Sequence, residues 1–274
     1  MSTTPNPSGS VLQHAIGLYR AAIGRCWPLS LIGAGLLAGT GLYWTAHTPT
    51  VRLEELDFDA AADLHMLLAN YLSPAALRVD FQIGMLAAVV ALIFYSALIA
   101  QLHAIAVSGE RASAWQALSA ALRRLPGTIV ACVSWILVTG GCLIVLLIPG
   151  NHAGLALLLL IPSIYLSGRL QLWWPAMFVE ELGAIAALRR SWAVTRSQWW
   201  RSAGALSWVL IVIGLLDLLA DAIVAAATGA STGVAQLLRF LANALLMPML
   251  PAALLATYYQ TARQAAKKTP QSGV

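Results

Sequence analysis

The stretch FQIGMLAAVVALIFYSALIAQLHAIAV occupies residues 81–107 and contains no Asp, Glu, Lys or Arg. A helix needs about 20 apolar residues to cross the hydrocarbon core of a bilayer, so this stretch is long enough to be a membrane span. The whole chain of 274 residues is 59% apolar and 10% charged, with a mean hydropathy of +0.77. Soluble domains carry about 25% charged residues, so the composition excludes a soluble domain, a disordered chain and a nucleic-acid-binding protein.

Six stretches have the length and composition of transmembrane helices. They are residues 28–44, 81–107, 128–148, 154–179, 202–226 and 234–260. Short connections at 149–151 and 228–233 predict hairpins between the third and fourth spans and between the fifth and sixth. We therefore expect an all-α, polytopic membrane protein. Residues 1–262 form its single membrane domain, residues 46–79 an external acidic loop, and residues 263–274 a basic cytoplasmic tail.

Basic residues lie mainly on one side of these spans. Most of the 16 Lys and Arg fall in the two tails and in the connections after the second and fourth spans. The opposite side has only Arg52 and Arg78. The positive-inside rule then places both termini in the cytoplasm. The net charge of +5 is a topology signal on this interpretation and predicts no nucleic-acid partner.

Large apolar side chains recur at helical spacing before the first, third and fifth spans. They are Leu12, Ile16, Tyr19 and Ile23; Trp115, Leu118, Leu122 and Leu125; and Ile185, Leu188, Trp192 and Trp199. An apolar stripe with basic flanks lies in the membrane interface and attracts anionic lipid. These helices either position the hairpins as elbows or bind lipid in their own right. The lipid-facing residues expected in the third segment are Arg189, Arg190, Trp192, Arg196, Trp199, Trp200 and Arg201.

The fourth and sixth spans share a proline-containing sequence, LWWPAM at 172–177 and PMLPAA at 248–253. Proline inside a helix frees backbone carbonyls, which neighbouring groups must then satisfy within a membrane. We interpret the chain as three repeats of an interfacial amphipathic helix followed by a transmembrane hairpin. Internal repeats occur in transporters and equally in passive membrane scaffolds, so the repeat does not decide between these functions.

Residues 169–176, RLQLWWPA, lead to Glu180, and residues 187–196, ALRRSWAVTR, lead to a Trp-Trp-Arg sequence at 199–201. This pattern resembles the membrane domain of some bacterial glycerophosphoryl diester phosphodiesterases and the related YciC-type inner-membrane proteins. The residues that carry it are Arg169, Pro175, Glu180, Arg190, Ser191 and Trp192. The resemblance implies an all-helical protein of the bacterial inner membrane. It implies no reaction, because the phosphodiesterase activity belongs to a soluble barrel of about 250 residues.

Four charged residues fall within the expected spans: Arg169, Asp217, Asp221 and Arg239. Such charges are costly in hydrocarbon and mark functional or paired groups. Helix rise places Asp221 at the depth of Arg239 and Arg169 within reach of Asp217. They form either structural ion pairs between the last three spans or a polar pathway with a titrating carboxylate.

Gly35 and Gly39 are one helical turn apart in the first span, a spacing that lets helices approach closely. The contact lies either within one chain or between two copies. No nucleophile elbow, phosphate-binding loop or His/Cys cluster occurs in the sequence, so we expect no metal, no cofactor and no enzymatic activity. The acidic residues Asp57, Asp59 and Asp63 lack the central glycine of a calcium loop.

The sequence therefore predicts a non-enzymatic, integral inner-membrane protein that organises partner proteins or lipids at the cytoplasmic face. Anionic phospholipid is the expected lipid, and a protein partner or a second copy of the chain is the expected macromolecular contact. The alternative is a transporter or channel subunit that uses the four charges within the spans. An intramembrane enzyme ranks last, because the sequence has no catalytic constellation.

Overall fold

The computed structural model describes residues 11–47, 76–109, 113–141, 153–196, 199–228 and 232–268. Within these ranges every long element is a helix, which confirms the all-helical class. The helices are α1 (Val11–His47), α3 (Ala76–Ser108), α4 (Ala114–Gly140), α5 (Ala153–Leu170), α6 (Trp173–Val179), α7 (Ala184–Thr195), α8 (Trp199–Thr228), α9 (Thr232–Leu246) and α10 (Met249–Lys268). The hairpin turn at 149–151 lies outside the described residues. The same holds for most of the expected acidic loop at 46–79, of which only residues 46–47 and 76–79 are described, and these are helical.

Five segments among the described residues are long and apolar enough to cross a membrane. They are Val11–Tyr43, Phe81–Ser108, Ala114–Gly140, Trp199–Ala220 and Gly233–Lys267. The chain thus has the architecture of a multi-pass membrane protein. The fourth expected span, 154–179, differs from the prediction because it is not one helix: α5 ends at Leu170 and α6 begins at Trp173.

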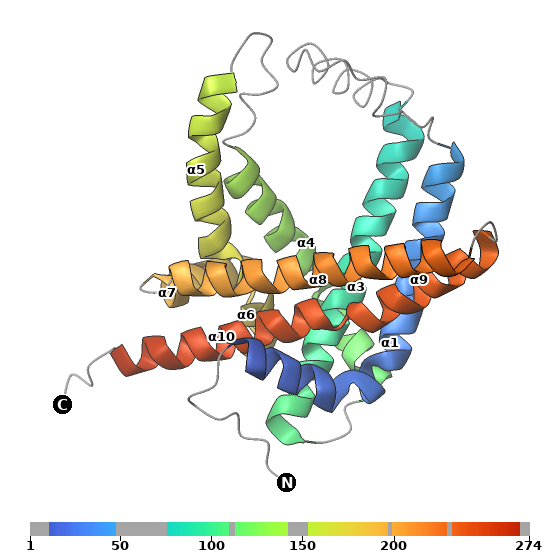
Figure 1. Ribbon diagram of the computed structural model, residues 1–274. Coiled ribbons are helices and arrows are strands. Elements are labelled where there is room, and N and C mark those ends of the chain that lie inside the picture. The colour runs from blue at the N-terminus through green and yellow to red at the C-terminus, as the bar shows by residue number, and fades with distance from the viewer. Residues whose placement is uncertain are drawn as a thin grey trace, which may run out of the picture.

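The expected interfacial segments are built in two ways. The first and second continue directly into the following spans, within α1 and α4, each of which contains a proline. The first turns of α1 nevertheless lie across the rest of that helix (Figure 1). The third segment is a separate helix, α7, which ends just before α8 begins.

The upper part of α1 and α3 and α5 stand upright in Figure 1, whereas α8, α9 and α10 run across them. The first half of α10 lies at the centre of the packing, and residues 251–258 are all buried. Helix α10 contacts α1, α3, α6, α7 and α8. These contacts explain why α10 contributes as many buried apolar residues to the core as the much more apolar α3.

Small side chains form the packed faces of all three interfacial segments. Ala15 and Ala22 in α1, Ala117 and Ala121 in α4, and Ala187 and Ser191 in α7 are buried. The large apolar stripes are divided between the outside and the core: Leu12, Trp115 and Ile185 are exposed, whereas Tyr19, Leu118 and Leu188 pack against the core. Exposed fractions reach 73% at Trp115 and 50% at Ile185. Each helix therefore packs through its small face and part of its stripe, and presents the remaining large apolar residues to the surroundings.

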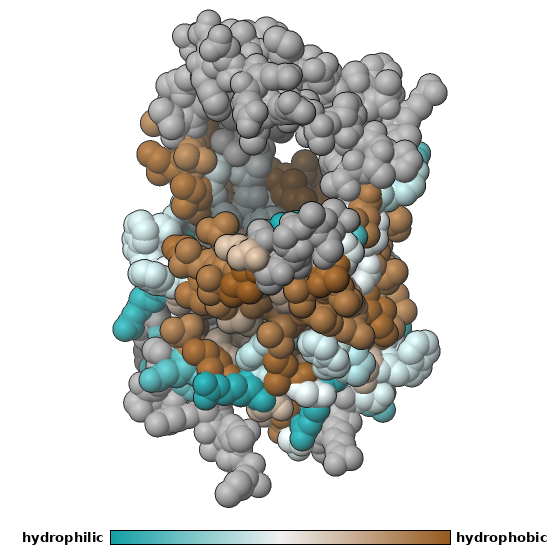
Figure 2. All heavy atoms as spheres, turned by 45° about the vertical axis from the view of Figure 1, so that its right-hand side comes forward, coloured by the Kyte–Doolittle hydropathy of each residue, from teal (hydrophilic) through white to brown (hydrophobic). Residues whose placement is uncertain are grey.

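On the face shown in Figure 2, apolar side chains cover the middle, and hydrophilic ones gather toward the lower end, where the first turns of α1 lie in Figure 1. Helix α8 has exposed apolar residues around most of its circumference, including Trp208, Leu210, Ile211, Leu216 and Leu218. A helix that is apolar all round is stable within protein or within lipid. Because the described residues leave this surface uncovered, lipid is the matching solvent.

The close helix contact in the first span is made by Gly33 and not by the expected pair. A Cβ atom at Gly33 would lie 2.8 Å from Met247 Cε and 2.9 Å from Phe94 Cγ. At Gly35 it would lie 3.5 Å from the Phe240 ring, an ordinary contact, and at Gly39 it would meet nothing within 4 Å. Gly33 therefore sets how closely α1 approaches α3 and the α9–α10 segment.

We expect Gly33→Ala to lower the stability of the chain, because overpacking a filled core costs about 1–3 kcal/mol. Gly39→Ala is the matched control, since it lies in the same helix and gains the same helix propensity, about 1 kcal/mol, without a clash. Thermal melts of the two purified variants in one detergent measure the difference. Equal melting temperatures would show that Gly33 does not limit the packing.

Candidate functional site: the break between α5 and α6

The site begins with an interruption of the helix at residues 171 and 172, which are in turn conformation. Pro175 is the third residue of α6. Its ring cannot donate a hydrogen bond and clashes with the carbonyl four residues earlier, which is that of Gln171. The helix restarts through the hydrogen bond from Ala176 N–H to the Leu172 carbonyl, at 3.2 Å.

Two hydroxyl groups of α7 bind the backbone at this break. Ser191 Oγ accepts a hydrogen bond from the Leu172 N–H at 3.1 Å and donates one to the Arg169 carbonyl at 3.0 Å. Thr195 Oγ1 donates to the same carbonyl at 2.9 Å. Both residues are fully buried. Helix α7 is thus fixed to the break by bonds that satisfy the backbone groups of an interrupted helix.

The Arg169 side chain lies against aromatic rings beside these hydroxyls. Its guanidinium carbon is 4.1 Å from the centroid of Trp192 and 5.8 Å from that of Tyr165. The position of Arg169 in the last turn of α5 is favourable for a cation, because the carboxyl end of a helix carries partial negative charge. The residue is only 2% exposed.

A carboxylate at the end of α6 joins three helices. Glu180 Oε1 lies 2.8 Å from Arg190 Nη2 and accepts a hydrogen bond from Arg190 Nε at 2.9 Å. The same oxygen accepts a hydrogen bond from the Tyr258 hydroxyl of α10. Partial burial raises the pKa of the Glu180 carboxyl, but the hydrogen bonds from Arg190 and Tyr258 and the charge of Arg190 outweigh burial, so the pKa lies below its ordinary value.

The next residue fixes α4 to the same corner. Glu181 has a φ of 54°, a left-handed conformation that costs a non-glycine residue roughly 1–2 kcal/mol. Its carboxylate lies 3.0 Å from Arg124 Nη2 of α4, and Arg124 also donates a hydrogen bond to the Met177 carbonyl. The left-handed turn therefore directs the two successive glutamates to different helices.

The break between α9 and α10 has the same design. Residues 247 and 248 are in turn conformation, and Pro251 is the third residue of α10. The carbonyl of Leu245, which corresponds to that of Arg169, accepts a hydrogen bond from Tyr19 of α1 at 3.0 Å. Pro248, which corresponds to Leu172, has no N–H to satisfy.

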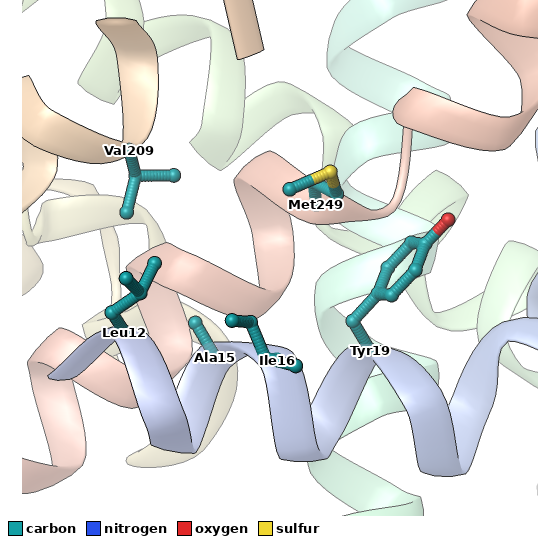
Figure 3. A pocket seen from close by; sticks show the side chains of 6 residues that line it. All are labelled: Leu12, Ala15, Ile16, Tyr19, Val209 and Met249. Carbon is teal, nitrogen blue, oxygen red and sulfur yellow. The ribbon is translucent and has the colours of Figure 1, made fainter. Parts of the chain in front are cut away.

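Tyr19 belongs to the large apolar stripe of the first interfacial segment. Figure 3 shows Leu12, Ile16 and Tyr19 facing Val209 of α8 and Met249 of α10 across a small apolar pocket. An interfacial segment therefore lies against each of the two broken helices.

The motif residues of the sequence converge at the α5–α6 break: Arg169, Pro175, Glu180, Arg190, Ser191 and Trp192 lie within one joint. The sequence alone does not identify Thr195, Arg124 and Tyr258 as parts of it. In the sequence, Thr195 is recognisable only as a polar residue at a position where the apolar stripe of α7 would otherwise continue. Nothing in the sequence marks Arg124 or Tyr258 as part of the joint.

Among the described residues, Arg169 and Asp217 do not form the expected ion pair. Arg169 contacts aromatic rings, whereas Asp217 is exposed on α8. Depth along a helix axis fixes the level of a residue and leaves its face undetermined, which explains this difference. Arg239 is exposed on α9, and the side chain of Asp221 lies outside the described set, so their pairing stays a prediction.

The interfacial residues of the third segment are mostly outward-facing. Arg189, Trp192, Arg196, Trp200 and Arg201 are exposed, whereas Arg190 is half-buried by its ion pair and Trp199 stacks on Trp200 at 3.9 Å between centroids. Among the described residues no group of three His, Cys, Asp or Glu is placed to hold a metal ion. The joint is built to hold helices in place and to present basic and aromatic side chains outward.

Comparison of the chain with protein-family models, curated proteins and solved structures gives no match. The resemblance to the phosphodiesterase membrane domain and to YciC-type proteins therefore stays an expectation from the motif residues.

We expect Ser191→Ala to destabilise the chain by about 1–3 kcal/mol, because it leaves the buried Leu172 N–H without a hydrogen-bond partner. Ser119→Ala is the control, since that hydroxyl bonds only a carbonyl of its own helix at an exposed position, and surface changes stay within about 0.5 kcal/mol. Denaturation of both variants in detergent tests this, and a neutral Ser191→Ala would contradict the bridging role.

We expect Glu180 to make the chain sensitive to acid. Its folded-state pKa is lowered, so the stabilisation is complete above the ordinary value of 4.5 and is lost as the pH falls through the lower folded-state pKa. The stability difference between the wild type and Glu180→Gln should therefore shrink from pH 7 toward acid. A constant difference for Glu180→Gln would refute the linkage.

Proposed function

We propose that the chain is a non-enzymatic, multi-pass protein of the bacterial inner membrane that organises anionic lipids or partner proteins at the cytoplasmic face. The observation that carries this proposal is the orientation of α7. Its small residues Ala187 and Ser191 are buried, while Trp192 and the arginines at 189 and 196 point outward.

An outward apolar stripe with flanking arginines is the pattern of a helix that lies in the membrane interface. Helices α1 and α4 also bury small residues and expose part of their large apolar stripe, Leu12 and Ile16 in α1 and Trp115 and Leu122 in α4, which supports three such helices. Each Lys or Arg near an anionic surface adds about 1 kcal/mol of attraction. An inner leaflet rich in anionic lipid is therefore the surface that this side of the chain fits.

The charge pattern supports cytoplasmic termini and six crossings. Arg20, Arg123, Arg201 and Lys267 are exposed and belong to the side that the positive-inside rule assigns to the cytoplasm. Helix α3 has 33 residues and α8 has 30, which exceeds the roughly 20 residues of a perpendicular crossing. Helices of this length can cross one bilayer while tilted, and α3 and α8 run in different directions in Figure 1.

The matched geometry of the two breaks supports the interpretation of the chain as three repeats of one unit. The hydrogen bonds from Gln171 N–H to Ser167 and from Met247 N–H to Asn243 both measure 2.9 Å. In both breaks an element from another unit donates a hydroxyl group to the freed carbonyl. The repeated units then place their interfacial helices on the same side of the membrane.

Labelling of single cysteines in intact cells tests this topology. In a chain without its native cysteines, we expect a membrane-impermeant maleimide to label Cys introduced at His47, Asn151 and Ala230. Positions 111, 196 and 268 should react only after the membrane is permeabilised. If a cysteine at position 151 or 230 is labelled only after permeabilisation, the corresponding hairpin does not cross the membrane. If a cysteine at position 196 is labelled in intact cells, the orientation is opposite to the one proposed.

A further inference from the structure

Arg169 is a buried cation for which the described residues supply no carboxylate. It is 2% exposed, and its Nε is a buried nitrogen without a hydrogen-bond partner. The ion pairs within the described part of the chain use Arg124 and Arg190 instead. A buried charge without a counter-charge is costly, so the position favours the binding of an anion from outside the chain.

Arg196 supplies a second guanidinium next to Arg169 in the fold, since it follows Thr195, whose hydroxyl lies 2.9 Å from the Arg169 carbonyl. Arg196 caps the end of α7, is exposed, and acts on Arg169 through its positive charge. Two arginines that repel each other are both stabilised by one shared anion. Guanidinium groups present a planar fork of N–H donors that matches the oxygens of a phosphate group.

Aromatic rings from three helices lie beside the Arg169 guanidinium. Trp192 of α7 lies under the Arg169 guanidinium, and Tyr165 of α5 packs edge-on against both Trp192 and Trp199 of α8. Trp192 covers one face of the guanidinium, whereas Nε, on its edge, is a buried nitrogen without a hydrogen-bond partner. Trp and Tyr are also the residues that proteins place at the level of lipid headgroups.

An exposed apolar stripe leads to Arg169 along α5. Leu158, Ile161 and Tyr165 are 62%, 67% and 37% exposed, and helical spacing places them on the face of Arg169. From residue 158 to 169 the stripe extends for roughly 16 Å, at a rise of 1.5 Å per residue. This combination of a basic end and an apolar length fits a molecule with a phosphate at one end and a hydrocarbon chain behind it.

We propose that Arg169 and Arg196 together bind the phosphate group of an anionic membrane phospholipid whose acyl chain lies along Leu158, Ile161 and Tyr165. This inference rests on the proposed function and adds to it a specific site. If lipid were attracted only diffusely to the basic face, all of its arginines would contribute similarly to lipid binding. A specific site requires that Arg169 and Arg196 contribute more than the other arginines do.

Native mass spectrometry of the full chain in detergent tests the site with three probes: phosphatidylglycerol, phosphatidylcholine with the same acyl chains, and inorganic phosphate. We expect the wild type to bind phosphatidylglycerol more tightly than phosphatidylcholine. Arg169→Gln and Arg196→Gln should each weaken phosphatidylglycerol binding about tenfold or more, as expected when charge-assisted hydrogen bonds are lost. Arg123→Gln removes the same charge from an exposed position on α4 and should weaken binding by about twofold at most.

The outcomes separate the site from the general function. Equal losses in all three variants, with phosphatidylglycerol still preferred, would overturn the site and leave the proposed lipid function intact. Equal binding of the two lipids by the wild type would overturn both. Inorganic phosphate that displaces the lipid at equal concentration would overturn the acyl-chain part. If Arg169→Gln does not fold, Arg196→Gln decides alone, since Arg196 is exposed and its loss opens no cavity.

Discussion

A helix that breaks in an apolar environment must have its freed backbone groups satisfied by the protein itself, and this requirement governs the packing of the chain. At the α5–α6 break the carbonyl of Arg169 and the N–H of Leu172 are satisfied by Ser191 and Thr195. At the α9–α10 break Tyr19 satisfies the carbonyl of Leu245. The positions of α7 and of the first turns of α1 therefore follow from the places where another helix is interrupted.

This constraint also explains which side of α7 faces outward. The hydroxyls that reach the break share a face with Ala187, so that face is small and buried. Trp192 borders this face, where it covers the Arg169 guanidinium, and it is also partly exposed together with Arg189 and Arg196. The polar bonds that fix the small face of α7 therefore also determine which side chains of α7 are exposed.

The sequence predicts the helical class, the positions of most apolar helices and the kinship of the LWWPAM and PMLPAA segments. It does not predict where a proline breaks a helix, because Pro28, Pro126 and Pro162 lie inside continuous helices. The two breaks lie where a hydroxyl from another element reaches the freed carbonyl, and that partner is distant in the chain. Spacing likewise selects Gly35 and Gly39, whereas the close contact depends on Phe94 and Met247, which spacing within one helix cannot reveal.

The Glu180 carboxylate connects this local joint to the core. Its partners Arg190 and Tyr258 come from α7 and α10, and Tyr258 ends the buried run of α10 that packs against most of the other helices. A shift of α7 along the membrane surface would therefore strain a bond to the centre of the molecule. Helix α7 also packs directly against α4, α5, α6 and α10. The carboxylate of Glu180 therefore adds a polar connection to these packing contacts, and together they couple the position of α7 to the central helix of the core.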